Sequence, residues 1–82
     1  YMEVVVVKDL PVQLLSGDKY EESTLLPGAP ISFTATDGES YMEFTLWDGT
    51  EGYFNFELDS DWIEMINGEE AYDYFEEVPM FG

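Results

Sequence analysis

Three consecutive segments of this chain alternate between apolar and polar residues, and short turn sequences separate them. They run from Pro30 to Thr36, from Tyr41 to Trp47 and from Tyr53 to Leu58. Side chains of a β-strand point to opposite faces with a period of two, so each segment has one apolar face. Those faces carry Ile31, Phe33 and Ala35, then Met42, Phe44 and Leu46, then Phe54, Phe56 and Leu58. The pattern predicts an antiparallel meander whose strands bury one common face.

Turn sequences also divide the chain on either side of this meander, which is typical of a small all-β domain. Before it, the apolar run from Val4 to Val7 predicts a first strand. The next extended segment contains Pro11, which has no backbone N–H and restricts that segment to a sheet edge. After the meander, the segment from Trp62 to Ile66 predicts a closing strand.

The last part of the chain changes from a strand pattern to a helical one. Ala71, Tyr74, Phe75 and Val78 have the i, i+3, i+4, i+7 spacing of a short amphipathic helix. Pro79 would end this helix. We therefore expect one domain over residues 1–82, with a closing strand plus a helix in residues 59–82.

The charge of the chain excludes several classes of function. There are 19 Asp and Glu residues against two Lys, with no Arg, His or Cys, giving a formal net charge of −17. Two Lys cannot neutralise a run of phosphates, so we expect no nucleic-acid binding, and an anionic membrane would repel the chain. No apolar stretch reaches the length of about 18 residues that membrane insertion needs. A hydrophobic fraction of 45% still predicts a packed core rather than disorder.

Catalysis is not expected from this composition. Without imidazole or thiol groups, the common zinc sites and nucleophile–base pairs are missing. Paired carboxylates can hydrolyse glycosides, but a chain of 82 residues lacks the depth for a cleft that would raise the pKa of one acid. We expect neither an enzyme nor a cofactor.

Two motifs carry a resemblance to a known family. The sequence DGTEGY at 48–53, after YMEFTL at 41–46, resembles the signature of bacterial SH3-like domains, in which an aromatic residue opens each strand around a D-G-x-x-G turn. Upstream, STLLPGAPISF at 23–33 is similar to the family's Leu-x-x-Gly segment and following strand, and residues 7–14 are similar in place to its first strand and the start of its long RT-type loop. The sequence departs from the family at 11–13, where Pro-Val-Gln replaces the usual Asn-Val-Arg, and in its longer tail.

The resemblance implies an all-β, small SH3-like barrel of five to six strands with a short C-terminal helix. Residues 1–58 would supply the barrel core strands. It also implies a non-catalytic recognition or architectural module of a larger, extracellular bacterial protein, which binds a peptide, a cell-wall component or a protein partner. An acidic inhibitor or DNA mimic that binds a basic partner is the alternative. A cytoplasmic location and any oligomeric state stay open.

A candidate ligand-binding face consists of Tyr41, Trp47 and Tyr53, which alternate out of phase with the apolar triplets. Exposed aromatic rings on one face can bind a peptide or sugar, or surround a cationic group. The alternative is that the C-terminal helix covers this face through Tyr74 and Phe75, or that the rings pair across strands.

A weaker candidate is a calcium site at Asp59, Asp61 and Glu64. Calcium takes six to eight oxygen ligands, and no complete D-x-D-x-D-G loop is present to supply them. The simpler interpretation of these carboxylates is a solvated acidic turn.

Overall fold

A computed structural model of the chain describes residues 3–77. Seven strands form one sheet: β1 (Glu3–Val6), β2 (Leu10–Ser16), β3 (Lys19–Leu25), β4 (Pro30–Thr36), β5 (Tyr41–Leu46), β6 (Glu51–Asn55) and β10 (Phe75–Glu77). Three short strands form a second sheet: β7 (Glu57–Leu58), β8 (Glu64–Ile66) and β9 (Glu69–Glu70). A single 3₁₀ turn, η1 (Ala71–Tyr74), joins β9 to β10. The expectation of a small, mostly β fold is confirmed.

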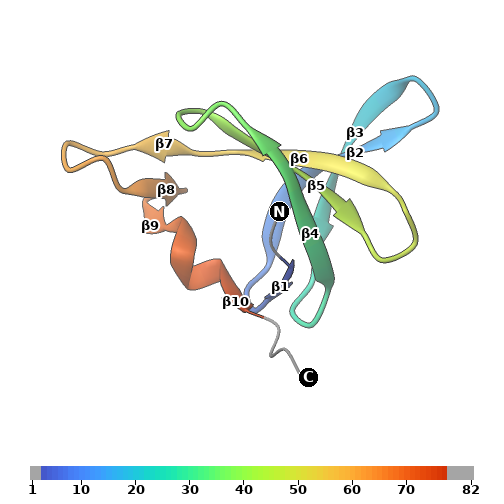
Figure 1. The fold of residues 1–82 in the computed structure, drawn as a ribbon, viewed down its shortest axis with the longest axis horizontal. Coiled ribbons are helices and arrows are strands. Elements are labelled where there is room, and N and C mark those ends of the chain that lie inside the picture. Colours follow the sequence, from blue (N-terminus) through green and yellow to red (C-terminus); the bar gives the residue numbers. More distant parts are fainter. Residues whose placement is uncertain (1–2, 78–82) are drawn as a thin grey trace.

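The larger sheet has the strand order β10-β1-β4-β5-β6-β2-β3, and its neighbouring strands are antiparallel. The expected meander is present as β4, β5 and β6, but its third strand ends at Asn55 instead of Leu58, which belongs to β7 of the second sheet. The first strand, β1, lies between β4 and the C-terminal β10 (Figure 1). Within residues 3–77, β3 and β10 are the two edges and do not pair with each other, so the sheet is not a closed barrel.

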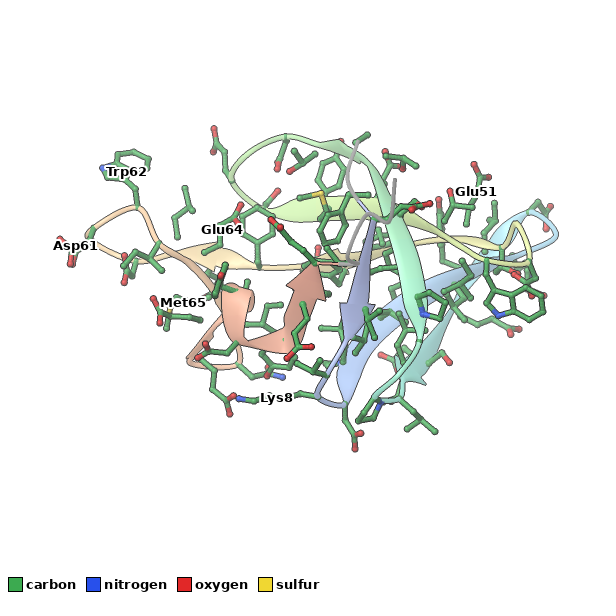
Figure 2. All side chains as sticks on the ribbon, turned by 60° about the horizontal axis from the view of Figure 1, so that its bottom comes forward. Lys8, Glu51, Asp61, Trp62, Glu64 and Met65 are labelled. Atoms are coloured by element: carbon green, nitrogen blue, oxygen red, sulfur yellow. The ribbon has the colours of Figure 1, made fainter. Side chains whose placement is uncertain are left out.

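The second sheet and the segment that follows it form an arm, which we define as residues 57–74. In Figure 1 the arm and the β2–β3 hairpin lie at opposite ends of the molecule. Figure 2 shows Asp61 and Trp62 at the outer end of the β7–β8 hairpin, with Glu64 closer to the main sheet. Among the residues that the structure describes, no helix has the length and apolar character needed to span a membrane.

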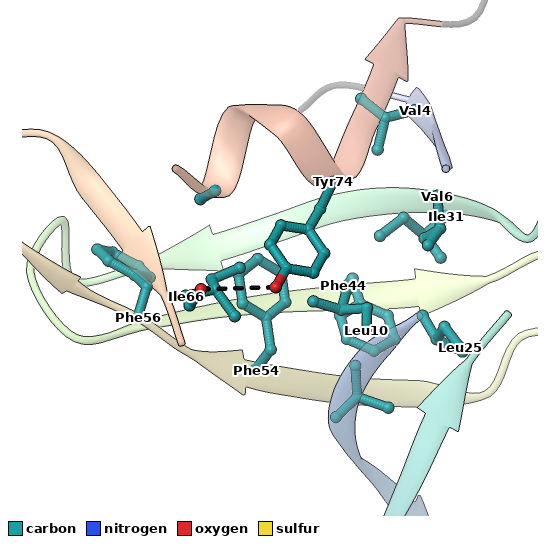
Figure 3. Close-up of a cluster of buried hydrophobic side chains, with 12 residues drawn as sticks. Val4, Val6, Leu10, Leu25, Ile31, Phe44, Phe54, Phe56, Ile66 and Tyr74 are labelled. Carbon is teal, nitrogen blue, oxygen red and sulfur yellow. Dashed lines mark hydrogen bonds between the residues drawn. The ribbon is translucent and has the colours of Figure 1, made fainter. Parts of the chain in front are cut away.

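The core lies on the inner face of the meander, where the sequence pattern places it (Figure 3). Phe44 is 1% exposed and lies against Val6 and Leu10, which are fully buried. Phe54 and Phe56 extend the core toward the arm, where Ile66 and Tyr74 close it. Phe33, Met42, Leu46 and Leu58 are half-buried at its margin.

Gly52 explains the second glycine of the D-G-x-x-G sequence. A Cβ at this position would lie 2.6 Å from the Gln13 carbonyl oxygen and 2.9 Å from Cζ of Phe44. Both distances are shorter than van der Waals contact, so only glycine lets β2 cross so closely over β6. The other glycine, Gly49, has φ of 92° in the β5–β6 turn.

Four local expectations need correction. Ala35 is exposed rather than part of the inner face, because the β4–β5 register shifts between Phe33 and Ala35. Pro11 does not lie on an edge strand, since β2 lies between β3 and β6. The pairing of β2 with β6 includes only Gln13 and Leu14, so Pro11 is paired with β3 alone. The strand expected from Trp62 to Ile66 is limited to β8, because Trp62 has φ of 64°.

The fourth correction concerns the expected C-terminal helix, which is wrong beyond one 3₁₀ turn. Residues 75–77 form β10, whose Phe75 lies opposite Val6 of β1. A helix this short is marginal on its own, so pairing with the free edge of β1 is the more stable arrangement. Val78 and Pro79, which the helix prediction also used, lie outside the described residues.

Candidate functional site

The predicted aromatic residues share a hairpin but do not lie side by side. Tyr41 and Tyr53 are half-buried on β5 and β6, where Tyr53 pairs with Glu43, whereas Trp47 is 82% exposed in the turn after β5. Positions 43 to 47 span about 13 Å at strand spacing. A ring must lie within about 6 Å of a cation to bind it through its π face. The spacing along the hairpin therefore does not favour a cage of Trp47 and Tyr53 around one cation.

Tyr53 instead contacts Tyr20 of β3, with ring centroids 4.9 Å apart and an edge-to-face angle of 78°. Tyr20 was not among the predicted site residues, because β3 reaches Tyr53 only across β2. The alternative in which Tyr74 and Phe75 cover the outer face is wrong. Tyr74 is buried in the core with its hydroxyl donating to the Ile66 carbonyl at 3.5 Å, and Phe75 packs on Phe33.

A groove of about 710 Å³, which we call the acidic groove, opens between the margin of the core and the C-terminal segment. Part of its apolar lining, which we call the floor, comes from Phe33, Met42, Phe54, Phe56, Ala71 and Phe75. The rings of Phe33 and Phe75 meet edge-to-face at 5.3 Å, and those of Phe54 and Phe75 lie 5.6 Å apart. Rings that pack on one another in this way form a rigid apolar surface.

The rim of this groove is negatively charged. Glu64 of β8, Asp73 of η1, and Glu76 and Glu77 of β10 line it, and all four are exposed. No basic side chain of residues 3–77 lines the groove. The site can therefore desolvate an apolar group and attract a positive charge.

The nearby Lys8 is engaged outside the groove. Its Nζ lies 2.6 Å from Oε2 of Glu69 and 5.3 Å from the ring centroid of Tyr74. The hydrogen bond to Glu69 raises the pKa of Lys8 above its ordinary value of 10.5. Lys8 therefore stays protonated at neutral pH, and of the rim carboxylates its charge acts on Asp73.

A second hollow, of about 870 Å³, lies between the β2–β3 hairpin and the arm. Its lining is mostly polar, with Gln13, Ser23, Thr24, Asn55 and Asn67 beside Met65. Phe54 and Phe56 line it as well, whereas Phe33 and Phe75 line only the acidic groove.

Of the three carboxylates considered for calcium, that of Asp59 accepts hydrogen bonds within its own turn. Oδ1 of Asp59 accepts hydrogen bonds from the backbone N–H groups of Asp61 at 2.8 Å and Ile63 at 2.9 Å. Asp59 therefore shapes the β7–β8 turn. Within residues 3–77, Asp59, Asp61 and Glu64 do not form a cluster that could hold a metal ion.

Two further carboxylates hold turns of the meander. Asp37 accepts hydrogen bonds from the hydroxyl and backbone N–H of Ser40, and these lower the pKa of its carboxyl well below the ordinary value. Asp48 accepts one from the backbone N–H of Thr50 at 3.0 Å, which also lowers its pKa. Both stay ionised and structural at neutral pH.

Comparison of the chain with known protein families, curated proteins and solved structures finds no match. The acidic groove was not expected from the sequence. Phe33 and Met42 were assigned to the apolar inner face of the meander, and the segment that carries Glu76 and Glu77 was predicted to be helical. The one signal that could have pointed to it is the concentration of rings and carboxylates in residues 72–77.

Proposed function

We propose that this chain is a non-catalytic recognition module that binds a basic protein or peptide partner. The observation that carries the proposal is the combination of exposed rings with an unneutralised acidic surface. Trp47, Trp62 and Tyr72 are each at least 80% exposed, and the net charge is −17. Aromatic residues are enriched at the centres of protein interfaces, and complementary charge steers a partner toward them.

We further propose that the larger sheet is an open variant of the SH3-like arrangement. In this interpretation β1, β4, β5, β6 and β10 are the barrel strands, and the β2–β3 hairpin takes the place of the long RT-type loop. The order β10-β1-β4-β5-β6 and the close contact at Gly52 support it. The arm is then an insertion before the last strand. On the same resemblance, we propose that the chain is part of a larger, extracellular bacterial protein that binds a peptide, protein or cell-wall component.

The second candidate function is an acidic inhibitor or DNA mimic. The net charge favours it, because a basic DNA-binding protein would be attracted to this surface. The exposed rings favour the first candidate, because a phosphate mimic has no use for apolar side chains in solvent.

Calorimetric titration of the protein tests the proposal. Three probes are used. The first is a synthetic peptide of Lys and Leu, the second is the same peptide with Glu in place of each Lys, and the third is purified peptidoglycan. We expect the basic peptide to bind and the acidic peptide not to bind. A partner in the cell wall would show as heat with peptidoglycan. If none of the probes binds at any salt concentration tested, the recognition proposal is wrong.

A competition experiment separates the two candidates. A basic DNA-binding protein is first loaded with fluorescent duplex DNA, and the chain is then added. Displacement of DNA at equimolar protein would favour the mimic. We expect no displacement beyond that caused by an acidic homopolymer of equal charge.

A further inference from the structure

The acidic groove leaves apolar side chains at the molecular surface without a cover among residues 3–77. Phe33, Met42 and Phe75 are only half-buried, although each packs on the core. Contact of such a surface with water is unfavourable, because apolar side chains gain free energy when they are buried. Apolar hollows with a polar rim are characteristic of binding sites.

The rim charge selects the occupant. The groove is lined by four carboxylates, those of Glu64, Asp73, Glu76 and Glu77, and by no basic residue of the described chain. Lys8 acts on Asp73 from outside the groove, so the rim keeps a net negative charge. A second copy of the chain would bring a further 17 negative charges to the groove, which disfavours self-association. An anionic lipid surface is repelled for the same reason.

We infer that the acidic groove binds a peptide segment in which a large apolar side chain is flanked by Lys or Arg. The apolar side chain lies on Phe33, Met42 and Phe75, and the flanking cations face the rim carboxylates. This inference rests on the proposed function and adds to it the site and the chemistry of the partner segment. Rim charges make such binding faster and salt-dependent, while the apolar floor sets the lifetime of the complex.

The test compares two double variants with the same change in net charge. Glu64→Lys with Asp73→Lys reverses the rim, and Asp18→Lys with Glu21→Lys reverses two exposed carboxylates of the distant β2–β3 hairpin. Titration with the Lys and Leu peptide should show an affinity loss of about tenfold or more for the rim variant. The hairpin variant should lose about twofold in affinity, because its charges lie far from the groove and salt screens their effect on the peptide.

Methionine methyl signals give a readout at the floor without any substitution. Met42 lines the acidic groove, whereas Met65 lines the second hollow. In a ¹³C-methyl-labelled protein, the peptide should shift the Met42 signal and leave the Met65 signal in place.

The outcomes separate this inference from the proposed function. Equal affinity losses in both double variants, with an unmoved Met42 signal, would overturn the groove while leaving recognition of basic partners intact. Absence of binding by the unaltered protein would overturn both. If the peptide binds only after residues 78–82 are removed, the occupant of the groove is the chain's own C-terminal segment. If sedimentation shows a dimer, the occupant is a second copy of the chain. Either result overturns the inference.

Discussion

The central meander and the arm are held by different kinds of interaction. In the meander, Phe44 and Phe54 are almost fully buried and their ring centroids lie 6.3 Å apart, so apolar packing between neighbouring strands determines the geometry. In the arm, strands of two or three residues follow one another, and the Asp59 carboxylate holds the first turn through two backbone hydrogen bonds. The comparison shows that local polar contacts can shape a projecting segment that contributes few side chains to the core.

The two turns of the arm differ as well. The β8–β9 turn uses Asn67 and Gly68, with φ of 51° and 80°, and both residue types tolerate the left-handed conformation. The β7–β8 turn places Trp62 in that conformation, with φ of 64° and an exposed fraction of 80%. A bulky residue in this region is strained by about 1–2 kcal/mol. The arm therefore stores strain at its outer end, where Trp62 gains no burial.

Truncation of the core should show the contrast most strongly. Phe44→Ala should lower the free energy of unfolding by about 3–5 kcal/mol, because a cavity would form where no neighbour can fill it. Ile66→Ala, at the junction with the arm, should cost about 2 kcal/mol. Urea denaturation measures both. Equal losses at the two positions would mean that the arm is as tightly packed as the meander.

Gly52→Ala should cost about 1–3 kcal/mol, because the new methyl group would overlap the Gln13 carbonyl and the Phe44 ring. Glu51→Ala, at the exposed preceding residue, is the matched control and should change stability by less than about 0.5 kcal/mol. Thermal melting of both variants measures the difference. An unchanged melting temperature for Gly52→Ala would show that β2 and β6 are further apart than described.

Trp62→Gly should raise the free energy of unfolding by about 1 kcal/mol, because glycine adopts positive φ without steric cost. Trp47→Gly is the control: Trp47 is equally exposed, but it is not among the positive-φ residues of the described chain. That variant should be neutral or destabilised, since glycine only adds entropy to the unfolded state. Loss of stability in Trp62→Gly would contradict strain at the end of the arm.

Asp59→Ala should lower the free energy of unfolding by about 1 kcal/mol, because two backbone N–H groups lose their acceptor. Asp61→Ala removes the same charge, while only its backbone N–H takes part in the turn. It should be neutral or slightly stabilising. Chemical denaturation measures the free energy of unfolding of both variants. Equal changes would mean that the charge of Asp59, and not its hydrogen bonds, affects stability.

The smallest expected effect is a pH dependence in the meander. Hydrogen bonds from Ser40 lower the pKa of Asp37 in the folded state, so its stabilising contribution is present above the unfolded value near 3.8 and is lost as pH falls through the lower folded value. The Asp37→Asn variant should therefore have a lower melting temperature than the wild type at pH 6, and the difference between the two melting temperatures should narrow below pH 3.8. Glu39→Gln serves as the charge control, since Glu39 contributes its backbone N–H to this turn. A gap that does not change with pH would contradict the role of the Asp37 carboxylate.

The meander was predictable because its information is local. Alternation with a period of two places Phe44, Phe54 and Ile31 on one face whatever their partners are, and the Asp-Gly pairs end the strands. The same local pattern was misleading at Ala35, where a shift in pairing with β5 turns the side chain outward. It was also misleading at Phe75, which has the spacing of a helical residue but lies in β10, where it pairs with the free edge of β1.

By itself the sequence determined an acidic, all-β chain with an apolar inner face, because charge and period-two alternation depend on neighbouring residues alone. Only the tertiary structure decided which strands meet. The contacts of Tyr20 with Tyr53 and of Phe33 with Phe75, and the acid-rimmed groove that the latter pair helps to form, join segments far apart in the chain. Such contacts depend on register and strand order, which arise when the whole sheet assembles.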